Sequence, residues 1–294
     1  MPHQTLISAA ELRALLAQGE PLVVLDCGFD LADPAAGERA FEQGHLPQAR
    51  YAHLDHDLSG IKTGRNGRHP LPLRNLLAQT MAQWGITPDI QVVTYDDQAM
   101  PYAARAWWLL RWMGHTNAAV LDGGRTAWLR GGGELVQGHL PAHHAAPYPA
   151  SATPAMHSIS AVSLQALLGQ PQLFLLDARA AERFRGEVEP LDPVAGHIPG
   201  ARQRFFKDNL AADGCFKTIT TLRAEFATLL ASSADAGPAA APVVQQCGSG
   251  VTACHNLLAM AHAGFGSSTL YPGSWSEWCS DPLRPMVKGP VAQR

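Results

Sequence analysis

The sequence has few charged residues, no block of basic residues and no long apolar run. Charged residues make up 16% of the 294 residues and the formal net charge is −3, so the composition does not indicate binding to nucleic acid or to an anionic membrane. No apolar run approaches the roughly 18 residues of a membrane helix, and the N-terminus lacks the basic and apolar regions of a signal peptide. We therefore expect a cytoplasmic protein with no nucleic-acid or membrane partner.

Cysteine is also scarce and irregularly placed. Five cysteines, an odd number without framework spacing, are typical of a reducing compartment. The histidines show no paired metal-ligand spacing, and Cys247 and Cys254 are too far apart for a Cys-x-x-Cys motif. We therefore expect no metal site and no cofactor.

What the chain does contain is an internal repeat. Val24–Asp26 recurs as Leu175–Asp177 after 151 residues, and Gly44–Arg50 recurs as Gly196–Arg202 after 152 residues. Further motifs recur at nearly the same offset, which chance similarity does not produce. The sequence therefore predicts a tandem duplication with an N-terminal domain at 1–137, a linker at 138–156 and a C-terminal domain at 157–294.

Each copy alternates apolar strand-like runs with helix-like runs. In the first copy Ser8 and Glu11 form a capping box that predicts a helix ending at Gly19. Further strands are expected at 21–26 and 91–96, and helices at 76–84 and 102–113. This alternation predicts an α/β fold in which each domain is a mostly parallel sheet flanked by helices. An Ala/Ser/Pro-rich stretch at 231–241 is expected to be a surface loop.

The most informative stretch is the loop that begins at Cys247. It follows an apolar run at 241–246 and precedes a helix-like run at 256–263, so we expect strand, tight loop and helix. The N–H groups of such a loop and the helix dipole favour an anion, which here is the Cys247 thiolate. The residues expected to surround the sulfur and the donor are Gly248, Gly250, Val251, Thr252 and Ala253. The alternatives are a buried structural cysteine or a Cys247–Cys254 disulfide.

The two copies differ at the strand end where this cysteine lies. The first copy has Asp96 at the position of Cys247, so we expect the N-terminal domain to be catalytically silent. A cysteine phosphatase would carry arginine six residues after its cysteine, where this chain has Ala253. His45 and His197 recur in both copies and are expected to satisfy buried backbone groups rather than to act in catalysis.

These motifs resemble those of the two-domain rhodanese family of sulfurtransferases over nearly the whole chain. The resemblance lies in the loop Cys247–Ala253 and in the segments Gly196–Ala201 and Gly273–Trp278, and the loop is most similar to that of the family members that use 3-mercaptopyruvate. It implies that sulfur passes from 3-mercaptopyruvate through a Cys247 persulfide to a thiol, a thioredoxin-like protein or cyanide.

The resemblance also implies roles for residues outside the loop. Arg183 matches the arginine that binds the donor carboxylate, although a surface arginine is the alternative. The region 189–192 lacks the second such arginine, and Arg185, Arg202, Arg204 and Lys207 stay open as substitutes. Asp55, His69 and Ser249 match a proton relay in some members. Ser249 as simply a small loop residue is the alternative.

Two other functions stay open at this point. The first is a thiosulfate sulfurtransferase, and the second is a non-catalytic persulfide carrier. Between Cys247 and Cys254 there is no Lys or Arg, which favours mercaptopyruvate over the doubly charged thiosulfate. On this view Gly248→Arg combined with Ser249→Lys would shift the preference toward thiosulfate.

Overall fold

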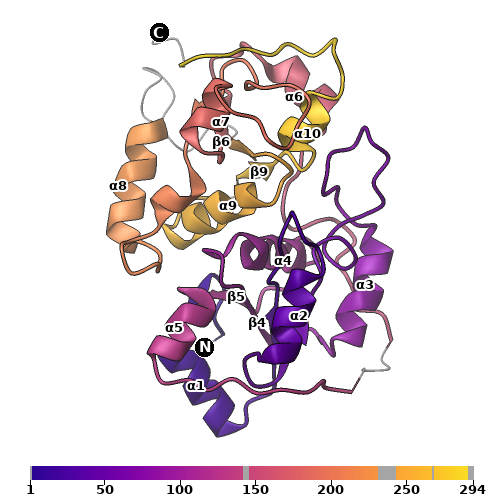
Figure 1. Ribbon diagram of the computed structural model, residues 1–294, viewed down its shortest axis with the longest axis vertical. Coiled ribbons are helices and arrows are strands. Elements are labelled where there is room, and N and C mark those ends of the chain that lie inside the picture. The colour runs from indigo at the N-terminus through magenta and orange to yellow at the C-terminus, as the bar shows by residue number, and fades with distance from the viewer. Residues whose placement is uncertain (1, 142–145, 231–242, 267, 291–294) are drawn as a thin grey trace. The chain divides into compact units, whose positions relative to one another are not determined.

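A computed structural model describes residues 2–141, 146–230, 243–266 and 268–290 (Figure 1). The chain forms two compact units. The first contains residues 1–60, 71–156 and 211–216, and the second contains residues 61–70, 157–210 and 217–294. The predicted loop at 231–241 and the first two residues of the run at 241–246 lie outside the described residues. The predicted boundaries at 137 and 157 stay a prediction.

The first unit is built on a five-stranded parallel sheet. Its order is β1-β5-β4-β2-β3, with β1 at Leu6–Ile7, β2 at Leu22–Asp26, β3 at Ala49–Tyr51, β4 at Gln91–Tyr95 and β5 at Ala118–Leu121. The helices are α1 Ala9–Gln18, α2 Ala36–Gln43, α3 Arg74–Gln83, α4 Pro101–Trp112 and α5 Gly124–Arg130. Helix α4 packs against β4 and β5.

The second unit contains a four-stranded parallel sheet of order β7-β6-β8-β9. These strands are β6 Phe174–Asp177, β7 Arg202–Gln203, β8 Val243–Gln246 and β9 Thr269–Leu270. The helical elements are α6 Ala161–Leu167, α7 Ala181–Arg185, the 3-10 helix η1 Phe206–Asn209, α8 Ile219–Leu230, α9 Thr252–His262 and α10 Ser274–Trp278. Its strand order repeats that of β3, β2, β4 and β5, which confirms the duplication and the α/β fold.

Local sequence signals explain where the elements begin and end. Ser8 Oγ accepts a hydrogen bond from the Glu11 N–H at 3.2 Å, and Gly19 ends α1 with φ of 68°, so the predicted capping box is confirmed. Helix α9 begins at Thr252, four residues before the predicted start. The first turn of α9 therefore lies closer to Cys247 in sequence than the apolar pattern indicated.

Each unit has its own apolar core. The first core includes Leu12, Val24, Phe41 and Trp128, and the second includes Phe184 and the side chains of Trp275 and Trp278. Among the described residues, no helix has the length and apolar character needed to span a membrane.

The two recurring histidines occupy equivalent positions and are confirmed as partners of buried backbone groups. The His45 ring stacks on Phe41 and lies 2.9 Å from the Leu46 carbonyl, and the His197 ring stacks on Phe184 and lies 2.8 Å from that residue's own carbonyl. Burial lowers the pKa of His197, so its ring is favoured in the neutral form.

Candidate active site

Cys247 lies directly after β8 and is 1% exposed. Its Sγ accepts a hydrogen bond from the Gly250 N–H at 3.1 Å, while its own N–H donates to Ser274 Oγ at 3.0 Å. Its carbonyl accepts a bond from the Trp275 N–H at 3.0 Å, so both ends of the residue are fixed to α10. All five cysteines are free thiols, which excludes the Cys247–Cys254 disulfide.

The loop turns back toward the sulfur at Gly250. This residue has φ of 76°, and a Cβ placed on it would lie 2.3 Å from the Pro272 carbonyl oxygen. Only glycine meets both conditions, and the result is an N–H group that points at Cys247 Sγ. Val251 follows with ordinary helical dihedrals, and Thr252 and Ala253 form the first turn of α9. Their contacts with a bound sulfur or donor stay predictions.

Segment 61–70 belongs to the second unit although it comes from the first copy of the repeat. Gly67 has φ of 82°, and its Cβ position would lie 2.7 Å from the Gly273 carbonyl, so glycine permits the close approach to α10. The next residue, Arg68, donates its N–H to Ser276 Oγ at 3.1 Å. These contacts fix the segment beside the cysteine loop.

Two of the three predicted relay residues are in direct contact. His69 Nδ1 lies 2.7 Å from Ser249 Oγ, and both residues are buried. Asp55 belongs to the first unit, where its N–H donates to His53 Nδ1 at 3.1 Å. The role of all three residues in proton transfer stays a prediction.

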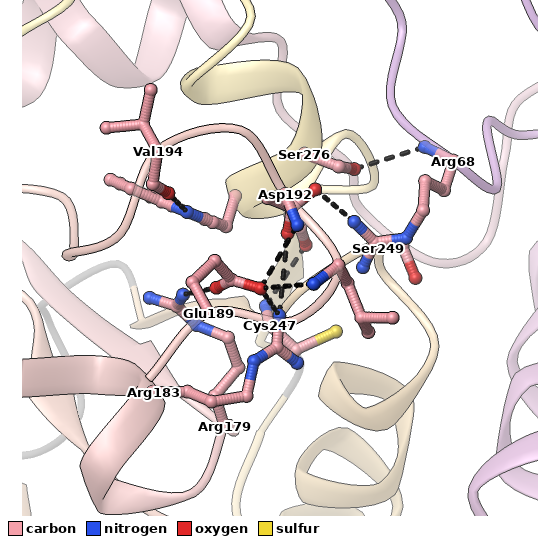
Figure 2. Close-up of polar contacts among 12 residues, drawn as sticks. Arg68, Arg179, Arg183, Glu189, Asp192, Val194, Cys247, Ser249 and Ser276 are labelled. Carbon is pink, nitrogen blue, oxygen red and sulfur yellow. Dashed lines mark hydrogen bonds and ion pairs between the residues drawn. The ribbon is translucent and has the colours of Figure 1, made fainter. Parts of the chain in front are cut away.

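A cluster of guanidinium and carboxylate groups lies beside the same loop. Arg183 Nη2 pairs with Glu189 Oε1 at 2.7 Å and with Asp192 Oδ2 at 3.5 Å, and Asp192 Oδ1 pairs with Arg68 Nη1 (Figure 2). Burial raises the pKa of Asp192, an effect that the positive charges of Arg68 and Arg183 oppose. Asp192 therefore joins two arginines that come from distant parts of the sequence.

Both guanidinium groups lie close to Gly248, the residue after the cysteine. A Cβ placed on Gly248 would lie 2.9 Å from Arg68 Nη2 and 3.6 Å from Arg183 Nη1. In Gly248→Arg, Arg68 would therefore have to move to make room for the new side chain, and the effect of Gly248→Arg with Ser249→Lys on the preference for thiosulfate stays a prediction. The loop itself has no cation, but two cations are supplied from elsewhere in the second unit.

Arg179 lies two residues after Asp177, the last residue of β6, and is buried. Its guanidinium forms three hydrogen bonds with the Asp177 carboxylate, two from Nε at 3.1 Å and one from Nη2 at 2.7 Å, and donates to the Gly196 carbonyl at 2.8 Å. It also lies over the Trp275 ring, 5.0 Å from the centroid. The Nη1 atom of Arg179 forms an ion pair with Glu189 Oε2 at 3.5 Å, so Arg179 and Arg183 both pair with Glu189.

The four basic residues suggested as substitutes for the second arginine have partners outside the cysteine loop. Arg185 pairs with Glu187, Arg204 pairs with Glu225, Arg202 lies over Phe174 and Lys207 lies over Phe206. The residue that the sequence analysis missed is Arg68. Its only sequence signal was its place in the glycine-rich, basic stretch at 61–69, which gives no indication of a long-range contact.

The equivalent loop of the first unit is arranged around a carboxylate. Asp96 Oδ1 accepts the N–H groups of Gln98 and Met100 at 2.9 and 2.8 Å, and Oδ2 accepts those of Tyr102 and Ala103 at 3.0 and 2.9 Å. Burial raises the pKa of Asp96 to about 6, while these N–H groups act to lower it. The first copy thus keeps an anion-binding loop whose N–H donors are occupied by its own side chain.

Comparison with known proteins gives consistent results. The model of the rhodanese-like domain matches residues 8–130 and 160–281. A probable 3-mercaptopyruvate sulfurtransferase of Pseudomonas aeruginosa is 48% identical over 98% of this chain and 100% of that one. A putative thiosulfate sulfurtransferase of Mycobacterium tuberculosis is 41% identical over 97% and 98% of the two chains. The structure of 3-mercaptopyruvate sulfurtransferase from Leishmania major matches with a TM-score of 0.80 at 29% identity, covering 95% of this chain and 75% of that one.

Proposed function

Since the chain belongs to the family of rhodanese-like domains, we propose that it is a sulfurtransferase that moves sulfur from 3-mercaptopyruvate through a persulfide on Cys247 to a thiol, a thioredoxin-like protein or cyanide. The observation that carries the proposal is the position of Cys247, with one loop N–H on its sulfur and two arginines beside Gly248. A nucleophilic sulfur and a carboxylate-binding site therefore lie within one residue of each other.

Two steps account for the reaction. The Cys247 thiolate attacks the donor sulfur, an S–S bond forms, and the carbon–sulfur bond breaks with its electron pair passing to the enolate of pyruvate. The enolate then takes a proton, for which the Ser249 hydroxyl and His69 imidazole are the candidate donors. In the second step the acceptor attacks the outer sulfur and restores the Cys247 thiolate.

The charge of the arginine cluster favours mercaptopyruvate over thiosulfate. Glu189 and Asp192 balance the charges of Arg183 and Arg68, so the site offers aligned N–H donors without excess positive charge. Such a site suits a singly charged carboxylate better than a dianion. Thiosulfate sulfurtransferase is kept as the second candidate, because a relative with that description is 41% identical.

Three of the other four cysteines should be poorer nucleophiles than the Cys247 thiolate. Burial raises the pKa of Cys27, Cys215 and Cys279, that of Cys279 to about 11, which favours their neutral thiols. We place the protein in a reducing, cytoplasmic compartment on the basis of its five free cysteines.

Mass spectrometry after incubation with each donor tests the proposal. We expect one added sulfur on the Cys247 peptide, none in Cys247→Ser, and a higher kcat/KM for mercaptopyruvate than for thiosulfate. Sulfur found mainly on another cysteine would overturn the role of Cys247. A higher kcat/KM for thiosulfate would select the second candidate, and persulfide formation without turnover would indicate a carrier.

A further inference from the structure

We propose that the first unit has a ligand-binding site of its own, a pocket at the ends of β2 and β4 that binds a small α-amino acid as a zwitterion. The pocket has a volume of about 180 Å³ and is lined by residues of the first unit. Pockets for drug-sized ligands measure roughly 300–1,000 Å³, so this pocket restricts its ligand to a small molecule. The inference does not depend on sulfur transfer by Cys247.

The first argument is the place of this pocket in the sheet. Strands β2 and β4 are neighbours, but the chain continues from β2 to β3 on one side and from β4 to β5 on the other. In open α/β sheets, ligands bind beyond the carboxyl ends of the strands at such a switch point. The pocket residues Asp26 and Tyr95 are the last residues of these two strands. The corresponding strands of the second unit are β6 and β8, and Cys247 directly follows β8.

The second argument is that the pocket has one positive and one negative side chain without partners. The Arg125 guanidinium and the Asp97 carboxylate both line it, and neither forms a hydrogen bond or an ion pair with a residue that the structure describes. Burial raises the pKa of Asp26, and the charge of Asp97 raises it further while that of Arg125 lowers it, so both charges act at the same pocket residue. The carboxylate and the ammonium group of an α-amino acid match Arg125 and Asp97 respectively.

The third argument is that the other acids of the pocket have partners. Both oxygens of Asp26 accept hydrogen bonds, one from the Gly28 N–H at 2.9 Å and one from the Tyr95 hydroxyl. Asp30 Oδ1 accepts the N–H group two residues later at 2.7 Å. Asp97 is therefore the acid that offers both oxygens to a ligand. Among the described residues no group of three or more potential metal ligands occurs, which favours an ammonium group over a metal ion.

The apolar wall of the pocket limits the side chain of the ligand. Phe29, Ala36 and Ala40 line this wall, and the last two belong to α2. A Cβ placed on Gly37 would lie 1.9 Å from the Gly28 carbonyl oxygen, so glycine lets α2 approach the loop that follows β2. Burial of a charged side chain against this wall would be costly. We therefore expect alanine or valine to bind better than a charged amino acid.

Isothermal titration calorimetry of the wild type with L-alanine and L-valine tests the inference. Analogues that lack one charged group are the ligand controls: propanoate and ethylamine for alanine, and 3-methylbutanoate and isobutylamine for valine. The variants are Arg125→Gln and Asp97→Asn. Asp89→Asn changes an exposed acid of the same unit, and Arg183→Ala tests for binding at the cysteine loop instead. Thermal unfolding of each variant checks that the fold is retained.

We expect at least one of the two amino acids to bind. Arg125→Gln, or loss of the ligand's carboxylate, should raise Kd roughly tenfold to a hundredfold, the range for charge-assisted hydrogen bonds. Asp97→Asn, or loss of the ligand's ammonium group, should raise Kd about threefold, because Asp97 is exposed and exposed ion pairs are weaker. Asp89→Asn and Arg183→Ala should leave Kd unchanged.

The inference would be overturned if neither amino acid binds, or if Arg183→Ala raises Kd and Arg125→Gln in a folded protein does not. Propanoate that binds as tightly as alanine, or 3-methylbutanoate that binds as tightly as valine, would overturn the assignment of a zwitterion. Since no sulfur donor is used, any of these results leaves the proposed function standing.

Discussion

The imidazole Nδ1 of His69 lies 2.7 Å from the hydroxyl Oγ of Ser249, although the two residues are 180 positions apart in the sequence. His69 comes from the first copy of the repeat and Ser249 from the second, yet both lie in the second unit. The His69 ring therefore contacts a hydroxyl group that lies two residues after the nucleophile Cys247 in the sequence.

If His69 and Ser249 act together in proton transfer, then either His69→Ala or Ser249→Ala should lower kcat for mercaptopyruvate by about 100-fold or more, the range for a lost general acid. The double variant should be little worse than either single variant, because both changes remove one path. The rate of pyruvate release measures this, with the exposed His157→Ala as control. Losses that multiply would show that the two residues act separately.

Replacement of Arg183 tests whether this residue binds the carboxylate of the donor. Arg183→Ala should lower kcat/KM for mercaptopyruvate by roughly tenfold to a hundredfold, and Arg183→Lys should lower it less because the charge remains without the planar fork. Steady-state kinetics measure the effect. Arg185→Ala serves as the control, because Arg185 pairs with Glu187 in a half-exposed position on the same helix. A fully active Arg183→Ala variant would show that the carboxylate is bound elsewhere.

Asp192→Asn should change the preference between donors. Loss of this negative charge leaves Arg68 and Arg183 balanced by Glu189 alone, so the ratio of kcat/KM for thiosulfate to that for mercaptopyruvate should rise at least threefold. Glu187→Gln removes an exposed carboxylate and should leave the ratio unchanged. An equal loss with both donors would mean that Asp192 serves only to hold the arginines.

Asp96 is predicted to stabilise the first unit. Asp96→Ala leaves four backbone N–H groups without their acceptor, those of the buried residues Met100 and Ala103 among them, and a buried group costs about 1–3 kcal/mol when it stays unsatisfied. Urea unfolding at pH 8 should therefore show a loss of at least ~2 kcal/mol. The neighbouring Asp97→Ala, at an exposed position, should have little effect. Equal stability of the two variants would contradict the stabilising role of Asp96.

His115 should make stability depend on pH. Burial lowers the pKa of its ring below the ordinary 6.5, and its Nε2 has no hydrogen-bond partner among the described residues. The unfolded chain therefore binds a proton near pH 6.5 that the folded chain takes up only at lower pH, so the free energy of unfolding falls as the pH is lowered through this window. His115→Gln should make this dependence shallower in urea unfolding from pH 8 to 5, and the exposed His157→Gln should not.

The sequence predicted local features better than long-range ones. The capping box at Ser8, the strand before Cys247 and the equivalence of Asp96 and Cys247 follow from short patterns or from the repeat. The start of α9 was misjudged because Thr252 and Ala253 are compatible with either loop or helix. Arg68 was missed because its ion pair with Asp192 depends on where segment 61–70 packs, and no periodicity in the sequence encodes the position of this segment.

The position of segment 61–70 also determines how this protein can be divided. A fragment that begins at residue 157 would contain Cys247 and Arg183 but would lack His69 and Arg68. The half that carries the cysteine therefore depends on ten residues encoded far upstream, and neither gene fission nor recombination at the junction between the copies would yield a self-sufficient half. Although the chain arose by repetition, its two copies have become interdependent through this segment.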